Sequence, residues 1–567
     1  MFGGNLNNSK LARFLWILPC ALTLGLYWKA IYFGFVWDDF HLIDDLLPYY
    51  KTLDDAFNKQ GIFGLPIYYY RPLFFVSFML ERMFWGVGPD AFHTSMVVSN
   101  VLATFLTYWI PLKILSKEEG AHWAALICSL LFACHPIHTE VVAWISGRPD
   151  AFLALFLLAS FYFYLQYREN FEKKRWLFLS LASYFLALLN KETAAPFFFS
   201  LLLYDYFFPP DEKLNLSRQE RKRLKPKRFS FHTHHYWFGG VLLLYLGLRH
   251  QYLSKIKMPD VSSLPILEMV QRELAILGLY IQKVFYPVHL NAFIADVPEG
   301  NVFVALGALF LLVFFLAGFV SLWKKQGRLI FFNLFFFLAT MLPALALAIL
   351  PVAKTVAAER YLYLPVFGIF FIVGLFFIRW PTSEAWRNSE IILFVKTAVV
   401  VGMIGTLSAM TYLHLPVWNS EYSFWMEMAK QNPEEGLPLQ NLAGGYQRID
   451  DLDTAMVLYE RALKAKNTTE GRAVAYNAMG VIQITWKNND AAIEYFKKAI
   501  SERPTYVHPY CNLGSIYYWK SEDAQGDEKK SLLTQVVYYL EGCVKRSSDP
   551  EKWNERLQLA KEELKKL

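Results

Sequence analysis

The chain has 567 residues, of which 55% are hydrophobic and 19% are charged. An average soluble protein carries about 25% charged residues, and the apolar excess lies before about residue 414, so composition excludes an ordinary soluble protein for that part of the chain. The formal net charge of +7 lies mostly in short loops between apolar runs, which argues against a nucleic-acid partner and is typical of membrane proteins.

Apolar runs recur along this first part, and about 20 apolar residues are enough for an α-helix to cross a membrane. They predict an all-α, polytopic membrane domain over residues 1–418 with about eleven spans. The first run lacks a small-residue cleavage site behind it, so we expect an uncleaved span rather than a signal peptide. The predicted spans are 14–36, 92–113, 122–141, 150–167, 176–190, 194–208, 236–253, 302–323, 330–350, 361–379 and 390–414.

Basic residues occupy every second loop, most densely in segment 209–235, and basic loops face the cytoplasm. The N-terminus is therefore expected inside. Loops 37–91 and 254–301, and everything after residue 414, are expected outside. Residues 266–287 are apolar enough to suggest another span, but such a span would move the basic residues that follow position 323 outside. We therefore expect a helix that lies in the membrane interface.

The composition becomes charged and soluble after residue 418, and this part carries a helical repeat. The tetratricopeptide (TPR) spacing of Gly, Ala, an aromatic residue, Ala and Pro is met by Gly480, Ala492, Phe496, Ala499 and Pro504. We predict an extracytoplasmic TPR domain over residues 419–567 that binds a protein or braces its neighbour. Cys511 and Cys543 lie in this part, and the sequence leaves open whether they pair.

Ionisable residues gather at the predicted extracytoplasmic ends of spans that are far apart in the sequence. Such residues are costly near a membrane and point to function, although a single Lys or Arg there is more often a cation that reaches up to water. Because the whole set lies on one side, we interpret it as a candidate site. The set comprises Asp38, Asp39, Arg71, His138, Glu140, Arg148, Lys191, Glu192, Glu359 and Arg360.

These residue types suit a lipid-linked donor with an anionic leaving group. Cations would stabilise the phosphate as its bond breaks, and a carboxylate would take the proton of an attacking hydroxyl. Asp38 and Asp39, in an extended segment, would point in opposite directions, so only one is expected to face the acceptor. A divalent metal is the alternative use of the acids. Asp44 and Asp45 are expected to be acids at a helix start.

Several motifs follow one another in order, namely "GFVWDDFHLI", "YYRPLFFVSFML", "HPIHTE" followed by "GRPD", "LNKETAAPFFF" and "AAERYLYLP". Together with the repeats, they resemble the transmembrane and TPR repeat-containing O-mannosyltransferase family, which are GT-C glycosyltransferases related to the protein O-mannosyltransferases. The resemblance runs from about Phe35 to the end of the chain. Animal members carry longer repeat arrays, so the short tail suggests a bacterial relative and leaves the sugar and the acceptor open.

The resemblance implies a GT-C membrane fold and a polyprenyl- or dolichyl-phosphate sugar as the donor. It also implies metal-independent, inverting transfer of mannose or a similar hexose to a hydroxyl, such as a protein Ser or Thr. By motif, Asp38 is the expected catalytic base, and Asp39 orients it or the acceptor. The cations expected at the donor phosphate are Arg71, Arg148, Lys191 and Arg360. Candidate sugar-binding or supporting groups are His138, Glu140, Glu192 and Glu359.

The expected partners are the bilayer, the lipid-linked sugar and an acceptor protein held by the repeats, with no metal or other cofactor. The membrane would be the inner membrane of a bacterium or the ER membrane of a eukaryote. Other functions stay open: a glycosyltransferase that modifies a glycolipid, a non-catalytic scaffold whose repeats dock envelope proteins, and a transporter. Transporters more often place charges at mid-span, whereas these charges gather at one face.

Overall fold

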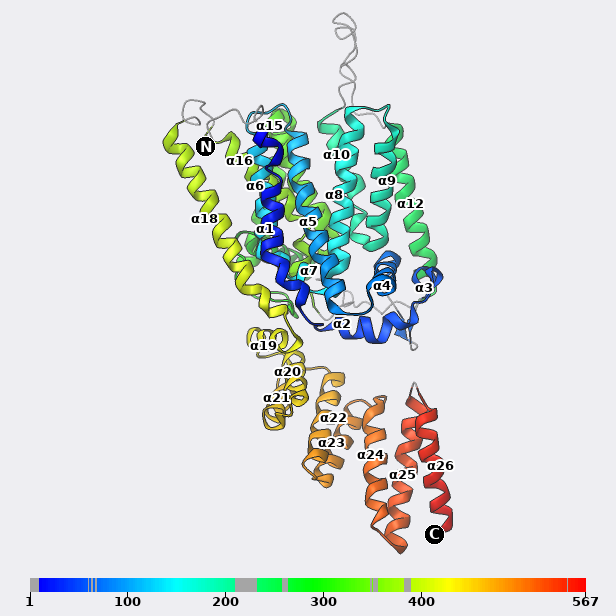
Figure 1. Ribbon diagram of the computed structural model, residues 1–567. Helices are drawn as coiled ribbons and strands as arrows, with labels where there is room; N and C mark the ends of the chain where they lie inside the picture. The colour runs from blue at the N-terminus through cyan, green and yellow to red at the C-terminus, as the bar shows by residue number, and fades with distance from the viewer. Residues whose placement is uncertain are drawn as a thin grey trace, which may run out of the picture. The chain divides into compact units, whose positions relative to one another are not determined.

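The computed structural model describes residues 10–59, 61–62, 65–66, 69–209, 232–256, 264–346, 349, 355–381, 389–547 and 549–567. Helices make up nearly all of the secondary structure of these residues (Figure 1), which confirms the all-α prediction. A short antiparallel pair, β1 (Gly61–Ile62) and β2 (Leu65–Pro66), interrupts the first loop. The chain divides into two compact units, Met1–Ser420 and Glu421–Leu567, here called the membrane unit and the repeat unit.

The membrane unit contains long apolar helices, and the chain is a multi-pass membrane protein. Its main helices are α1 (Ile17–Tyr27), α5 (Pro89–Ile114), α6 (Ala121–Cys134), α7 (Thr139–Ala143), α8 (Arg148–Glu169), α9 (Lys174–Asn190), α10 (Phe197–Phe207), α12 (Thr233–Leu253), α13 (Ile266–Phe285), α14 (Asn301–Trp323), α15 (Lys325–Leu345), α16 (Val366–Arg379) and α18 (Glu390–His414). Each predicted span overlaps one of these helices.

Fewer helices are long and apolar enough to cross a membrane than the sequence predicts. Among the described residues there are six, or seven if the bent pair Ala121–Cys134 and Pro136–Ala143 is one span. Helices α9, α10, α12 and α16 are not among them. The predicted count of eleven is therefore not confirmed. Helix α13 is not among them either, so its place in the interface stays a prediction. Most of the basic segment 209–235 lies outside the described residues.

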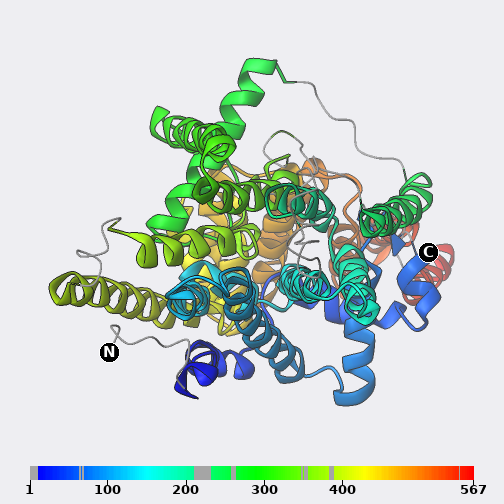
Figure 2. The ribbon, with the colours of Figure 1, turned by 90° about the horizontal axis from the view of Figure 1, so that it is seen from above.

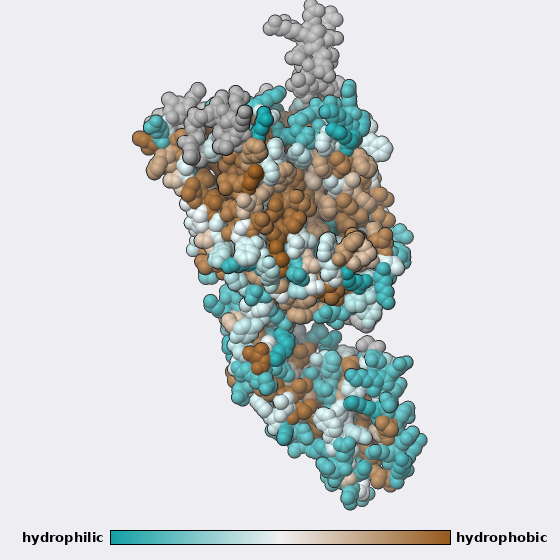
Figure 3. All heavy atoms as spheres, in the orientation of Figure 1, coloured by the Kyte–Doolittle hydropathy of each residue, from teal (hydrophilic) through white to brown (hydrophobic). Residues whose placement is uncertain are grey.

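The helices differ strongly in how far they are buried. The apolar windows of Pro89–Ile114 and Ile145–Glu169 are 61% buried, whereas those of Asn301–Trp323 and Glu390–Trp418 are only 17% and 11% buried. Helices α5 and α8 therefore form the centre, and α14 and α18 expose apolar surface that suits lipid. Figure 2 shows α18, in yellow-green, at the rim of the bundle, and Figure 3 shows apolar residues gathered over this unit.

The first loop folds against the central helices instead of extending into water. It contains the helices α2 (Asp38–Phe40), α3 (Leu53–Asn58) and α4 (Pro72–Trp85), and a π-helical turn, η4 (His41–Leu46), follows α2 directly. A buried apolar cluster joins this loop to α5 and to the segment before α8; it includes Leu42, Ile43, Tyr50, Phe74, Phe78, Phe92 and Ile145. This packing fixes the segment that begins at Asp38 on the membrane unit.

The repeat unit consists of helical hairpins, as the TPR spacing predicts. Its helices are α19 (Glu421–Gln431), α20 (Gly436–Arg448), α21 (Leu452–Lys464), α22 (Thr469–Thr485), α23 (Asn489–Glu502), α24 (Val507–Glu522), α25 (Gly526–Arg546) and α26 (Glu551–Lys566). Gly480 lets α22 approach α23 closely, because a Cβ at this position would lie 2.6 Å from the Phe496 ring. The glycine and the aromatic residue of the motif therefore belong to one packing contact.

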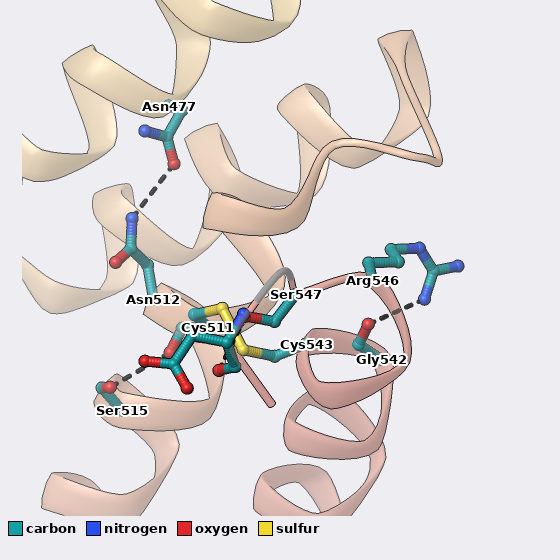
Figure 4. Close-up of a disulfide and its surroundings, with 9 residues drawn as sticks. Asn477, Cys511, Asn512, Ser515, Gly542, Cys543, Arg546 and Ser547 are labelled. Carbon is teal, nitrogen blue, oxygen red and sulfur yellow. Dashed lines mark hydrogen bonds between the residues drawn. A yellow bond between two sulfur atoms is a disulfide. The ribbon is translucent and has the colours of Figure 1, made fainter. Parts of the chain in front are cut away.

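A disulfide joins Cys511 of α24 to Cys543 of α25, at a sequence separation of 32 (Figure 4). This settles the pairing that the sequence left open. The bond lies within a buried core that includes Leu513, Leu533 and Leu540. Because disulfides persist in oxidising compartments, the bond fits the predicted extracytoplasmic place of the repeat unit.

We expect the double variant Cys511→Ser, Cys543→Ser to unfold its repeat unit more easily, because the unfolded chain regains the freedom of a 32-residue loop. A loop of this length corresponds to about 3–4 kcal/mol of unfolding free energy. Thermal unfolding of the full chain in detergent measures the loss. Wild-type protein treated with reductant should behave like the variant, and equal stability of oxidised wild type and variant would contradict the expectation.

Candidate active site

A cavity of about 310 Å³ lies on the membrane unit where the first loop meets the ends of several helices. Four of the ten predicted site residues line it, namely Asp38, Arg71, Lys191 and Arg360. The other lining residues are His41, Leu42, Leu46, Tyr69, Phe74, Trp144, Ser146, Pro149, Asp150 and Tyr361. The structure thus brings one predicted carboxylate and three predicted cations, from distant parts of the sequence, to one cavity.

The backbone turns sharply just before Asp38. Trp37 has a positive φ of 52°, a conformation that bulky residues rarely adopt and that persists only where the surroundings hold it. Its indole stacks on Trp144, with ring centres 5.1 Å apart and planes 12° apart. Asp38 follows as the first residue of α2 and lines the cavity. The stacked indoles therefore hold the turn that presents this carboxylate.

Asp39 points away from the cavity and is fully buried. Its carboxylate accepts hydrogen bonds from the N–H and Oγ of Ser146 at 2.8 and 2.6 Å, and from the N–H of Val36 at 3.1 Å. Burial raises the pKa of Asp39 to about 7, against the effect of these hydrogen bonds. The two acids separate because they start a helix, where successive side chains diverge by about 100°, and not because the segment is extended. Asp39 therefore ties the loop to the segment before α8, whereas Asp38 lines the cavity.

The three cations of the cavity share one arrangement: each is paired with an acid. The pairs are Arg71 with Glu192 at 2.6 Å, Lys191 with Asp150 at 2.5 Å, and Arg360 with Glu140 at 2.5 Å. Among these acids Glu140 and Asp150 are buried. A buried acid offsets much of the cost of holding a cation near a membrane. The acids Glu140 and Glu192 therefore act as supports for the cations.

Aromatic rings also hold the cations. The guanidinium of Arg71 lies 4.8 Å from the centre of the Tyr69 ring. Tyr361 lies between the other two, at 4.5 Å from the ammonium of Lys191 and 4.8 Å from the guanidinium of Arg360. Such contacts stabilise a cation and restrict its position. The sequence did not predict Tyr69 or Tyr361, although Tyr361 is adjacent to Arg360 and Tyr69 lies two positions before Arg71.

Arg148 does not reach the cavity and is fully buried. It pairs with Glu81 at 2.8 Å, donates to Ser77 and Ser95, and lies 3.9 Å from the centre of the Phe78 ring. Arg148 was predicted to contact the donor phosphate, but its burial outside the cavity favours a structural place instead. Arg148 joins α8 to α4 and α5, and a buried charge with these partners is fixed in place.

His138 and Glu359, predicted to bind the sugar or to support the site, also lie outside the cavity, which favours a supporting place. His138 is buried between Phe132 and Tyr363, and its Nδ1 lies 2.8 Å from the carbonyl oxygen of Phe132. Glu359 is buried and pairs with Lys283 at 2.9 Å. Burial raises the pKa of Glu359 to about 7, and Lys283 opposes this rise. Both residues stabilise the fold around the site.

A second polar cluster lies where α10 ends and α12 begins. The Nε2 atoms of His234 and His235 lie 3.1 and 2.9 Å from Oδ2 of Asp205, close enough for all three to surround a metal ion. The N–H of His232, however, donates to Nδ1 of His235 at 3.1 Å. The neutral His235 ring therefore carries its proton on Nε2, where a metal would need a lone pair. The cluster fits a hydrogen-bond network that joins two helices.

Comparisons with known proteins agree with the motifs. Residues 82–218 match the family "Dolichyl-phosphate-mannose-protein mannosyltransferase", and residues 473–506 match "Tetratricopeptide repeat". Protein O-mannosyl-transferase TMTC1 of Mus musculus is 36% identical over 157 residues, which cover 26% of this chain and 16% of the mouse protein. Protein O-mannosyl-transferase tmtc2 of Xenopus laevis is 30% identical over 241 residues, 40% of this chain and 28% of the frog protein.

The resemblance to the transmembrane and TPR repeat-containing O-mannosyltransferases is thus confirmed, and these matches span less than a third of the length of either relative. Among solved structures, the apo crystal structure of the Archaeoglobus fulgidus oligosaccharyltransferase is similar with a TM-score of 0.40 and 12% identity. That similarity covers 75% of this chain and 59% of the archaeal chain.

The Arg71–Glu192 pair should make stability depend on pH. Burial alone would raise the pKa of Glu192, but Arg71 outweighs it and lowers the pKa to about 2. A lowered carboxyl pKa contributes stability above the unfolded value of about 4.3 and loses it as the pH falls toward the folded value. We expect Glu192→Gln to unfold at a lower temperature than wild type at about pH 6, with the difference shrinking below about pH 4.3. Thermal unfolding in detergent measures this difference. The control is Glu541→Gln, which removes the exposed ion pair of Glu541 with Lys561 in the repeat unit. A constant difference would contradict this expectation.

Proposed function

We propose that this chain is a membrane glycosyltransferase. It would move mannose or a similar hexose from a polyprenyl- or dolichyl-phosphate donor to a hydroxyl, such as that of a protein Ser or Thr. The observation that carries the proposal is that Asp38, Arg71, Lys191 and Arg360 line the same cavity. The similarity to named O-mannosyltransferases supports the reaction class.

The reaction needs a base for the acceptor and positive charge for the leaving group. In the proposed inverting step, the acceptor oxygen attacks C1 of the sugar while Asp38 takes its proton. The bond from C1 to the phosphate oxygen breaks on the opposite face, and the lipid phosphate leaves as an anion. Arg71, Lys191 and Arg360 would stabilise that charge in a site arranged beforehand. A guanidinium has five N–H donors, so an acid at one edge still leaves donors for phosphate.

The cation set supports a metal-independent reaction, because it supplies the positive charge that a metal would otherwise provide. The acids also fit this proposal. Asp39 is turned away from Asp38 and bonded to Ser146, and Asp150, which lines the cavity, is bonded to Lys191. A hard divalent cation such as Mg²⁺ or Mn²⁺ would need several oxygen ligands directed at one point.

The repeat unit would select or present the acceptor protein. Its disulfide supports a place in an oxidising compartment, on the side where the predicted topology also puts the cavity. This would be the periplasm for a bacterial inner membrane, or the lumen for an ER membrane. The alternatives are a glycosyltransferase that acts on a glycolipid and a non-catalytic scaffold that docks envelope proteins.

In Asp38→Asn the side chain keeps its shape but can no longer accept the proton of the acceptor hydroxyl. We expect transfer from a lipid-phosphate sugar to fall by about 10²- to 10⁴-fold, with the affinity for the donor nearly unchanged. Transfer to a Ser/Thr peptide and direct donor titration, both on purified protein in detergent, measure the two effects. The matched control is Asp44→Asn, at a nearby exposed acid outside the cavity. Full transfer by Asp38→Asn would refute the assigned base, and no transfer by wild type would favour the scaffold.

Deletion of residues 421–567 removes the whole repeat unit at its boundary. If the repeats select the acceptor, the truncated chain should still transfer sugar to a small hydroxyl acceptor but work poorly on a natural protein. Mass spectrometry of envelope proteins and glycolipids from cells with the full or the truncated chain measures this. Unchanged protein glycosylation would show that the repeats do not read the acceptor, and a change in glycolipids alone would favour the glycolipid reaction.

A further inference from the structure

His41 lines the same cavity as Asp38, and neither the motifs nor the proposed reaction assign it a role. The helical segment that begins with α2 and continues into η4 sends one face into the cavity, through residues Asp38, His41, Leu42 and Leu46. Their spacing of three and four residues is that of neighbours on a helix face. His41 therefore lies about one helical turn beyond the proposed base.

Asp45 holds the imidazole of His41. Its Oδ2 lies 2.9 Å from Nδ1 of His41, and both side chains are 58% exposed. An ionised carboxylate only accepts hydrogen bonds, so Nδ1 carries the proton and Nε2 of the neutral ring keeps its lone pair. A partner on one ring nitrogen commonly sets the role of the other. Asp45, expected from the sequence to be only an acid at a helix start, thus makes Nε2 of His41 a hydrogen-bond acceptor.

The polar groups of the cavity are divided between chain segments. The cations Arg71, Lys191 and Arg360 come from the starts and ends of other helices, whereas the segment of α2 and η4 contributes Asp38 and His41. A phosphate is rich in acceptor oxygens and suits the cations. A hydroxyl or amide N–H is a donor and suits Asp38 and His41. The exposure of His41 also puts it where a substrate from the aqueous side arrives.

We infer that His41 is an acceptor-positioning residue whose Nε2 accepts a hydrogen bond from an N–H or O–H of the acceptor substrate. Asp45 fixes the tautomer, and the contact places the reacting hydroxyl at Asp38. This inference rests on the proposed glycosyltransferase function. It adds no proton transfer and no new bond to that reaction, because His41 acts only on the position of the acceptor.

Steady-state kinetics of the full chain in detergent test the inference, with a polyprenyl-phosphate mannose donor and a Ser/Thr peptide. In His41→Ala, the acceptor KM should rise about five- to tenfold, the size of one hydrogen bond, while the donor KM stays at the wild-type value. His41→Gln should recover most of the loss, because its Oε1 can accept near the position of Nε2. Asp45→Ala should show part of the effect, and its matched control Asp44→Ala should show none.

The two kinds of failure are distinct. If wild type transfers sugar and His41→Ala leaves the acceptor KM unchanged, or raises the donor KM instead, the inference is overturned and the proposed function stands. If wild type transfers nothing, the proposed function falls and the inference falls with it. Thermal unfolding of each variant guards against a purely structural effect: an equal rise of both KM values that follows lost stability would overturn the inference. A small alcohol acceptor, which has no amide N–H, shows which group of the acceptor donates to His41. A rise in KM with the peptide alone assigns the contact to a peptide N–H, and a rise with both acceptors assigns it to the hydroxyl.

Discussion

The pairing of each cavity cation with an acid is the constraint on which the site depends. An unpaired cation held near a bilayer would cost several kcal/mol, so a cavity rich in positive charge needs acids around it. Arg71, Lys191 and Arg360 each have such an acid. The acids come from other helices than their cations, and the pairs therefore also fix those helix ends relative to one another. The same three ion pairs therefore compensate the charge of the cations and determine the shape of the cavity.

The two adjacent acids at the cavity have different places. Asp38 lines the cavity, whereas Asp39 is buried and held by Ser146 and Val36. The turn at Trp37, stacked on Trp144, starts α2 at Asp38 and directs it to the cavity. A sequence with two adjacent acids thus produces one anchor and one exposed carboxylate. The anchor fixes the position from which the other acts.

The sequence predicted the elements better than the contacts. The apolar runs predict the membrane helices and the spacing of the TPR motif predicts the repeats, and the structure contains both. Of the predicted site cations, Arg71 lines the cavity and Arg148 does not, although both precede a proline at a helix start and look alike locally. Arg71 lies at the cavity beside Tyr69, whereas Arg148 lies in the core beside Phe78. Only the packing of α4 against α5 and α8 separates them, and no local pattern contains that information.

His41 is the reverse case, because it lies inside the motif "GFVWDDFHLI" and yet the sequence indicates no function for it. A histidine one turn beyond an aspartate has no distinctive signature in sequence. In the structure its meaning comes from Asp45, which determines the ring nitrogen that bears the proton. The exposed acids of this loop are therefore not equivalent. Asp44 is exposed, Asp45 contacts the imidazole of His41, and Asp38 lines the cavity, so neighbouring carboxylates of one loop have three different surroundings.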